Sequence, residues 1–262
     1  KQLDPAQIKI LNDWVKSGVS WDPTALDPDA VELVAVDVAP PPAGYQPVFA
    51  VAMSPDGNRL AIARADAIEI RDLAATNQPV VREARTRRDA IQSLAWSPDG
   101  STLAAGAFRR VTLWDAAELT SARELTNGIV DRVTALAFSP DGRWLAWADG
   151  VNARSGVLRL FDRKSQSVVA SWRAHKDTIF SLEFSRDSAR LVTAGGDKLV
   201  KVWDVSDRRE IAALEGHTAQ VLGAAFNTNA TQVVSGGADK QLKVWDIATK
   251  ERLTTLGNHS SA

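Results

Sequence analysis

A segment of twelve residues that occurs twice, 42 residues apart, constrains the fold of this chain more than any other feature. Residues 193–204 read Thr-Ala-Gly-Gly-Asp-Lys-Leu-Val-Lys-Val-Trp-Asp, and residues 235–246 read Ser-Gly-Gly-Ala-Asp-Lys-Gln-Leu-Lys-Val-Trp-Asp. Self-similarity at a fixed period of about 20–50 residues is the signature of a repeat architecture, in which each repeat is one supersecondary unit. We therefore expect most of the 262 residues to be copies of one unit.

A recurring turn divides each unit. Ser-Pro-Asp-Gly occupies residues 54–57, 97–100 and 139–142, and degenerate copies occupy 185–188 and 227–230. Proline presets the backbone of a turn, and Asp and Gly tolerate the remaining angles. Segments of alternating apolar residues flank each copy, which predicts a β-hairpin, and two further short strands complete each unit. The predicted four-stranded units cover residues 48–83, 91–126, 133–172, 179–214 and 221–256.

Four strands per repeat at this period indicate an all-β protein, a β-propeller of four-stranded antiparallel blades. Gly-His at 216–217 followed by Trp-Asp at 245–246, and Ala-His at 174–175 followed by Trp-Asp at 203–204, resemble the WD-repeat motif. The resemblance implies a WD-repeat (WD40) β-propeller over residues 47–262. Because propellers of this family usually close with about seven blades, we expect the five visible repeats to be part of a seven-bladed propeller. Asn-His at 258–259 would then open a sixth repeat.

The resemblance also implies a buried tetrad of hydrogen-bonded side chains in two repeats. A buried imidazole between a carboxylate and a hydroxyl, with an indole N–H as donor, leaves each of these polar groups satisfied. The residues that match the tetrad are His175, Thr193, Asp197 and Trp203 in one repeat, and His217, Ser235, Asp239 and Trp245 in the next. The first three repeats lack the His, and Ile62, Ala105 and Trp147 stand at the position of Thr193. We expect apolar packing to hold those three blades together.

The N-terminal residues differ from the repeats. Asp4-Pro5 and an apolar stripe that ends before Gly18 predict a helix over residues 1–21. Residues 22–46 are rich in Pro and Asp and predict a linker, within which 31–38 is a candidate strand that closes the last blade. Residues 3–21 resemble the C-terminal helix of the cytochrome c-like domain of planctomycete-type proteins. The helix is equally well explained as a cap on the propeller.

If the cytochrome resemblance holds, the haem-binding Cys-x-x-Cys-His would lie upstream of Lys1. Haem c is therefore expected only before this chain begins, and we expect no cofactor within it. The first residue is not Met, so we expect an N-terminal portion to be missing. Localisation stays open: periplasmic or exported with a cytochrome domain, and cytoplasmic otherwise.

Composition excludes several classes of function. A net charge of −1 gives no general attraction to nucleic acid or membranes. The chain has no cysteine, so it forms no disulfide or thiolate metal site, and it has no apolar run of about 18 residues. An arginine cluster is the one candidate basic patch, although a solvated loop face is the simpler interpretation. Its members are Arg82, Arg85, Arg87, Arg88, Arg109 and Arg110.

The three histidines do not indicate a catalytic or metal site. They recur at 42-residue intervals, so each lies at the same point of a successive blade. The tetrads account for two, and the start of a sixth repeat accounts for His259. No nucleophile, zinc or phosphate motif is present. A hydrolytic or lyase propeller with a metal in its channel would need acidic residues or His at the strand starts, and none stands there. We expect no enzyme and no metal.

Partner contacts are expected at the loops that lead into the first strand of each blade. In relatives with WD repeats, the residues flanking the first apolar position of that strand point to partners. Here they are Gln92, Arg132, Thr134, Thr178, Phe180, Gln220 and Leu222. The sequence therefore predicts a bacterial, non-enzymatic scaffold for protein–protein interaction. The alternative is the propeller of an exported c-type cytochrome that docks a redox partner. Self-association through open blade edges is a third expectation.

Overall fold

The computed structural model describes residues 47–86 and 89–257, in which twenty strands form five four-stranded sheets. Every neighbouring pair of strands is antiparallel, so the predicted all-β class and four-stranded blades are confirmed for these residues. The helix predicted at 1–21, the linker at 22–46 with its closing strand at 31–38, and the opening of a sixth repeat at 258–259 lie outside the described residues.

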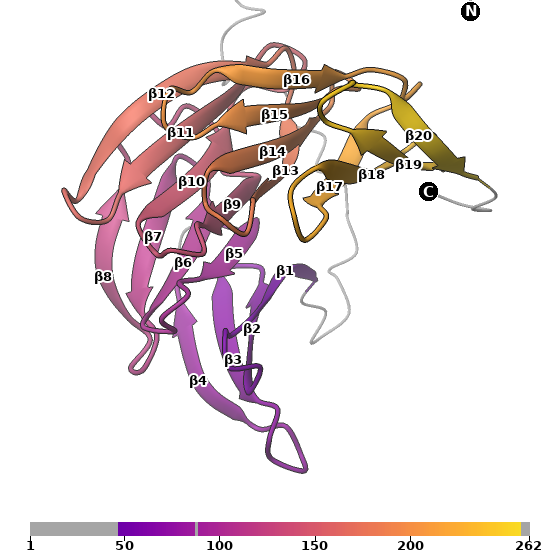
Figure 1. Cartoon of the computed structure of the whole chain (residues 1–262). Coiled ribbons are helices and arrows are strands. Elements are labelled where there is room, and N and C mark those ends of the chain that lie inside the picture. The colour runs from indigo at the N-terminus through magenta and orange to yellow at the C-terminus, as the bar shows by residue number, and fades with distance from the viewer. Residues whose placement is uncertain (1–46, 87–88, 258–262) are drawn as a thin grey trace, which may run out of the picture. The chain divides into compact units, whose positions relative to one another are not determined.

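Each sheet, here called a blade, is a meander whose strands lie in sequence order, and the five blades follow one another along the chain (Figure 1). The strands of blades 1 to 5 are, four to a blade, β1 (Val48–Met53), β2 (Arg59–Arg64), β3 (Ala67–Asp72), β4 (Val80–Arg85), β5 (Ser93–Trp96), β6 (Thr102–Ala107), β7 (Arg110–Asp115), β8 (Thr120–Leu125), β9 (Ala135–Phe138), β10 (Trp144–Asp149), β11 (Gly156–Asp162), β12 (Ser167–His175), β13 (Ile179–Phe184), β14 (Arg190–Gly195), β15 (Val200–Asp204), β16 (Glu210–Leu214), β17 (Val221–Phe226), β18 (Gln232–Gly237), β19 (Leu242–Asp246) and β20 (Arg252–Leu256).

The first strands of blades 2 and 3 begin two residues later than the sequence pattern suggests. The amides of Ile91 and Val133 donate to the carbonyls of Ala65 and Ala107 in the preceding blade, at 2.9 and 3.1 Å. These two apolar residues therefore link one blade to the next before the strand starts.

Hydrophobic side chains form one cluster between each pair of successive blades. Ala61 and Ile68 of blade 1, for example, pack with Leu94 and Leu103 of blade 2, and three of these four side chains are fully buried. Three more clusters repeat this arrangement up to blade 5. Burying one such side chain stabilises a fold by about 1.5–3 kcal/mol, so these interfaces hold the blades face to face.

The Ser-Pro-Asp-Gly segments form the predicted tight turns. In the first, Ser54 Oγ donates to Asp56 Oδ1 at 2.5 Å and accepts from the Arg59 amide at 2.8 Å, while Gly57 has a φ of 72°. The degenerate copies keep the same shape without glycine, since Ser188 and Ala230 take φ values of 61° and 53°. A single non-glycine residue in the left-handed region costs little compared with the hairpin that it closes.

Candidate functional site

The four residues of the blade 4 tetrad lie within hydrogen-bond distance of one another. His175 Nδ1 lies 2.8 Å from Asp197 Oδ1, and His175 Nε2 lies 2.7 Å from the Thr193 hydroxyl. The indole N–H of Trp203 donates to the same hydroxyl at 3.0 Å. Burial acts to raise the pKa of Asp197, but hydrogen bonds from His175 and two backbone amides outweigh it and lower the pKa. The group thus pins the loop before β13 to the sheet.

Blade 5 repeats this arrangement and adds a lysine. His217 Nδ1 lies 2.9 Å from Asp239 Oδ2, and Ser235 Oγ lies 2.8 Å from both His217 Nε2 and the Trp245 indole nitrogen. The buried Lys243 ammonium donates to the Gly216 carbonyl at 2.6 Å and to Asp239 Oδ2 at 3.3 Å. Burial lowers the pKa of His217, Asp239 raises it, and Lys243 lowers it again, so the net direction is downward.

Glycine at the end of the second strand leaves room for the imidazole. A Cβ atom on Gly195 would lie 2.5 Å from His175 Nδ1, and one on Gly237 would lie 2.7 Å from His217 Nδ1. Real Cβ contacts are not this short, so any larger residue would displace the histidine.

Blades 2 and 3 lack the histidine, and other side chains occupy the positions of the tetrad. In blade 2, the Trp114 indole nitrogen is buried without a partner, because Ala105 offers no acceptor. In blade 3, a buried ion pair adds to the expected apolar packing. Trp147 is fully buried, and beside it Arg159 Nε donates to Asp149 Oδ1 at 2.7 Å in a buried ion pair.

The ion pair of blade 3 is held by further hydrogen bonds. Arg159 also donates to the Ser171 hydroxyl and to the Gly128 carbonyl, and Asp149 Oδ2 accepts from the Val130 amide at 3.0 Å. These contacts fasten the loop before β9, as the tetrads fasten the corresponding loops of blades 4 and 5.

A pocket of about 440 Å³ opens on the side of the blades that carries the loops from one blade to the next. This side is here called the crossover face. Three blades contribute to the lining, which consists of Gln92, Phe108, Asp131, Arg132, Thr134, Gly150, Asn152, Thr178 and Phe180. Five of the seven residues predicted to contact a partner thus lie in one pocket.

Hydrogen bonds between blades shape this pocket. Thr134 Oγ1 donates to the Ile179 carbonyl at 2.6 Å, and Thr178 Oγ1 donates to Asn152 Oδ1 at 2.5 Å. Arg132 is exposed, and Phe108 on the facing loop keeps 45% of its surface in solvent. A guanidinium and an aromatic ring are therefore available to a ligand on a framework that is already fixed.

The structure separates two predicted contact residues from this pocket and adds others. Gln220 and Leu222 belong to the loop and first strand of blade 5 and do not line it. The sequence pattern did not indicate Phe108 and Asn152, because they lie on loops between second and third strands. The loop at 150–155 has six residues where the corresponding loop of blade 4 has four, and this extra length was the available signal.

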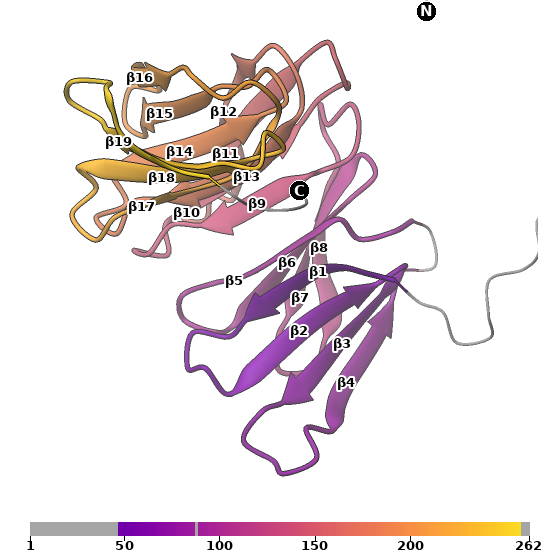
Figure 2. The same cartoon turned by 90° about the vertical axis from the view of Figure 1, so that its right-hand side faces the viewer.

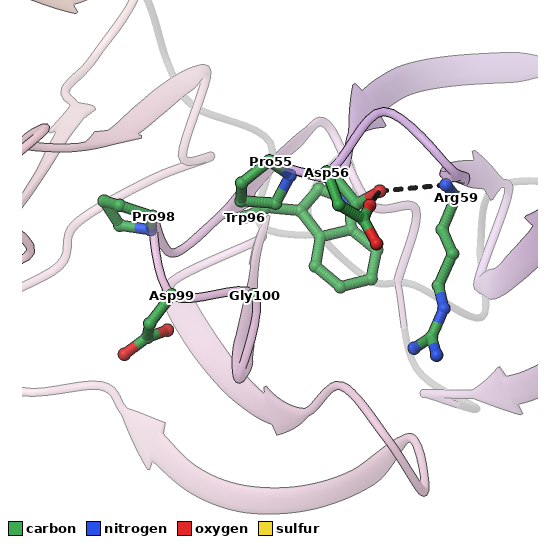
Figure 3. Close-up of a pocket in the computed structure, with 8 residues that line it drawn as sticks. Pro55, Asp56, Arg59, Trp96, Pro98, Asp99 and Gly100 are labelled. Atoms are coloured by element: carbon green, nitrogen blue, oxygen red, sulfur yellow. Dashed lines mark hydrogen bonds between the residues drawn. The ribbon is translucent and has the colours of Figure 1, made fainter.

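A second pocket, of about 420 Å³, lies at the turns of blades 1 and 2 (Figure 3). Polar groups of several residues that line it are already engaged within the protein. The Trp96 indole donates to the Ala52 carbonyl at 3.0 Å, and Asp99 Oδ1 accepts from the Ser97 hydroxyl at 2.5 Å. That hydroxyl holds the pKa of Asp99 well below its usual range, although burial acts in the opposite direction. We assign these residues to the turns.

The arginine cluster does not form an unpaired basic patch among the described residues. Arg85 contacts Glu83 at 3.2 Å, and the buried Arg110 contacts Asp89 at 3.3 Å. Arg87 and Arg88 lie outside the described residues. Among the residues that the structure describes, no group of three or more His, Cys, Asp or Glu residues could hold a metal ion. No helix there is long and apolar enough to cross a membrane.

Meandering four-stranded blades with a buried His-Asp-Ser/Thr-Trp tetrad define a β-propeller of WD type. The family model "WD domain, G-beta repeat" (WD40) matches residues 81–115, 124–162, 166–204 and 208–246, more than half of the chain. The chain therefore belongs to the WD40-repeat family. Each match runs from the fourth strand of one blade to the third strand of the next. Strands β1–β3 precede the first match, and there Arg71-Asp72 replaces Trp-Asp.

Curated relatives share part of this repeat array. An uncharacterized WD repeat-containing protein of Synechocystis sp. is 31% identical over 57% of this chain and 42% of its own length. The anaphase-promoting complex subunit cdc20 of Dictyostelium discoideum is 31% identical over 45% of this chain and 23% of its own. The WD repeat-containing protein 91 homolog of the same organism is 28% identical over 44% and 15%. The chain thus spans less than half of the length of these relatives.

Proposed function

We propose that this chain is a non-enzymatic scaffold that binds a partner protein at the crossover-face pocket. The observation that carries the proposal is the pocket itself, in which Gln92, Arg132 and Phe180 come together from three successive blades. Membership of the WD40-repeat family supports binding rather than catalysis. One relative is named as a subunit of a multiprotein complex, which points the same way.

The lining suggests what kind of segment the partner offers. Phe108 and Phe180 provide apolar surface, while Asp131 and Arg132 place charges of both signs beside it. Aromatic and arginine side chains on a rigid surface are the residue types that most often dominate binding energy. An extended peptide segment with one apolar side chain next to a charged one fits this combination. Such binding needs no cofactor, and no feature of the pocket favours nucleic acid.

A phage-displayed random peptide library, panned on the whole chain, tests the proposal. We expect enriched peptides that combine an apolar and a charged residue. Phe108→Ser should weaken their binding by about tenfold or more, because hot-spot truncations cost about 2 kcal/mol. Phe108 is 45% exposed, so this variant should fold normally.

Val169→Ser is the matched control, since Val169 is 40% exposed on β12, away from the pocket. It should bind the peptides like the wild type. Failure to enrich any peptide, or equal binding by the Phe108→Ser variant, would refute the proposed site. The alternative of a cytochrome adaptor has no support from the family match or the relatives, and the helix predicted at 1–21 that suggests it lies outside the described residues.

A further inference from the structure

Arginine side chains bridge the first two junctions between successive blades. Arg82 on β4 donates from Nε to the Ala117 carbonyl of blade 2 at 3.0 Å. Arg123 on β8 donates to the Gln166 carbonyl of blade 3, also at 3.0 Å. Both acceptors belong to the turn between the third and fourth strands of their blade, so each arginine spans its junction at the end of the blades opposite the crossover face.

Blade 4 has an alanine at the position of these arginines. Arg82 pairs with Ile70 on the third strand of blade 1, and Ala212 pairs with Val202, which stands at the same place in blade 4. Ala212 is buried at the junction with blade 5, but its side chain is too short to reach the turn of that blade. The fourth junction, where blade 5 packs on blade 4 (Figure 2), therefore lacks the bridge.

The third junction also has an alanine at this position, Ala170, but an aromatic side chain compensates for it. Trp172, two residues further along β12, packs edge to face on Trp203 of blade 4, with the ring centroids 6.0 Å apart. Blade 4 has the smaller Leu214 at the place of Trp172. Among the four junctions between described blades, only the fourth thus has neither the arginine nor the tryptophan.

A pocket opens at this fourth junction. Its volume is about 440 Å³, whereas the corresponding pocket at the first junction, which Arg82 lines, has about 130 Å³. Pockets that bind small ligands typically measure about 300–1,000 Å³ and combine apolar walls with a few polar groups. The wider pocket, called here the blade 4–5 pocket, is lined by Arg190, Ile211, Thr231, Asp246, Ile247, Ala248 and Lys250.

The charged side chains of the blade 4–5 pocket are two bases and one acid. Arg190 donates from Nη1 to the Ala230 carbonyl of blade 5 at 2.8 Å, which holds its guanidinium beside the pocket. Lys250 is exposed, and no described group pairs with its ammonium. Asp246 Oδ1 already accepts from the amide and the hydroxyl of Thr249, at 2.8 and 3.2 Å. Donors that can bind an anion therefore outnumber the free acceptors.

The turn at the first junction has the opposite charge. There Glu118 lies 4.0 Å from Arg82 and compensates the charge of the arginine. Counted from the third-strand Trp-Asp of each blade, blade 5 has Thr249 at the position of Glu118 and Lys250 at the position of Leu119. The turn of blade 5 thus has no acid at that position and one additional base. The fourth junction therefore favours a carboxylate where the first holds a guanidinium.

We propose that the blade 4–5 pocket binds a carboxylate with an aliphatic body. Ile211, Ile247 and Ala248 supply apolar surface for the body, and Arg190 and Lys250 supply donors for the carboxylate. Hydrogen bonds between ionised groups are about twice as strong as those between neutral groups, so the charge of the ligand decides its affinity. The ligand takes the place that the chain's own side chains take at the other junctions.

Titration of the whole, ¹⁵N-labelled chain with sodium hexanoate, followed by NMR, tests the proposal. We expect the amide signals of Ile247, Ala248 and Lys250 to shift and to saturate with a dissociation constant on the order of 1 mM, because so small a ligand gains little binding energy. Hexanol lacks the charge and should bind several-fold more weakly, and hexylamine should not bind. The peptide acetyl-Leu-Asp-amide presents the same two groups within a chain. Its affinity relative to hexanoate distinguishes a free acid from a protein segment as the source of the carboxylate.

Two variants locate the site. Ala212→Arg should abolish the shifts, because the new side chain can fill the pocket as Arg82 does at the first junction. Lys250→Gln should weaken binding by up to about fivefold, as expected for the loss of one exposed charge pair. Blade 3 carries glutamine at this turn position with the same left-handed backbone, so Lys250→Gln should fold normally. Val169→Arg adds the same charge to an exposed strand of blade 3 and is the matched control, which should bind like the wild type.

Equal binding of hexanoate and hexylamine, or shifts confined to other parts of the chain, would overturn the proposal. Unchanged binding by Lys250→Gln, or no binding of either hexanoate or the peptide, would do the same. If Ala212→Arg does not fold, its amide spectrum will show this, and Lys250→Gln still decides. The blade 4–5 pocket lies at the end of the blades opposite the crossover face, so these results would leave the proposed function untouched.

Discussion

At the scale of single residues, the tetrads show how one hydroxyl oxygen decides whether a buried indole N–H has a hydrogen-bond acceptor. Trp203 donates to Thr193 at 3.0 Å and Trp245 donates to Ser235 at 2.8 Å. Trp114 occupies the equivalent position in blade 2, but its indole nitrogen has no partner. A buried donor without an acceptor loses the solvation it had in water, so blade 2 carries a cost that blades 4 and 5 avoid.

Replacing Ala105 with serine should remove this cost. Ala105 stands where Thr193 stands in blade 4, so the new hydroxyl would lie within reach of the Trp114 indole. We expect Ala105→Ser to raise the free energy of unfolding by about 1 kcal/mol, measured by urea denaturation. Ala104→Ser is the control: it buries a hydroxyl on the other face of the strand and should destabilise. An equal loss of unfolding free energy in both variants would contradict the equivalence of Ala105 in blade 2 and Thr193 in blade 4.

Protonation of His217 should make stability depend on pH. Its pKa in the folded protein lies below the usual value of 6.5, because burial opposes the charged form. As the pH falls, the unfolded chain therefore binds this proton before the folded protein does. The stabilisation from neutral His217 is complete above about pH 6.5, and it is lost as the pH falls through the pKa of the folded state. The melting temperature should decline from about pH 6.5 to 4.5, above the range where carboxylates dominate. His217→Gln should flatten the curve, and an unchanged slope would contradict this assignment.

At the scale of the element, blade 3 fastens its entering loop with a buried ion pair instead of a tetrad. The Asp149 side chain is 0% exposed and that of Arg159 is 11% exposed. Arg159 donates to the Gly128 carbonyl. Lys243, which stands at the equivalent position of blade 5, donates to the Gly216 carbonyl. Two different side chains thus hold the same loop, which explains why the blade keeps its shape after losing the histidine.

Removing one partner of this ion pair should be costly. Asp149→Ala would strand a buried guanidinium, so we expect a loss of about 3–5 kcal/mol in urea denaturation. The double change Asp149→Leu with Arg159→Met should lose less than the sum of its single variants, since no charge is then left unpaired. Glu210→Ala, which breaks the more exposed Lys201–Glu210 pair, should cost about 0–1 kcal/mol. Additive effects of the two blade 3 changes would show that the pair is not coupled.

At the scale of the whole described array, each blade packs only on its neighbours. The four hydrophobic clusters each join two successive blades. Stability in such an array is close to a sum over blades and the interfaces between them. Within the described residues, blades 1 and 5 each take part in one of these interfaces. The crossover-face pocket also depends on the whole array, because residues of three blades line it.

The repeat period and the turns could be predicted because they depend on local chemistry, whereas the tetrad residues followed from the resemblance to WD repeats. A Ser-Pro-Asp-Gly segment forms a turn through its own side chains, and strict alternation assigns each strand residue to a face. Repetition every 42 to 46 residues then carries one assignment to the next unit.

Only the tertiary structure decided which side chains from different blades meet, and which interface positions stay uncovered. Asp149 and Arg159 pair across two strands, although nothing in their spacing distinguishes them from exposed charges. Phe108, Asn152 and Gln92 share a pocket because loops of unequal length bend toward the same point. Such contacts depend on loop geometry and on the packing of whole blades. Local pattern fixes neither, so the sequence determined the repeated unit and its faces, and the structure determined the site.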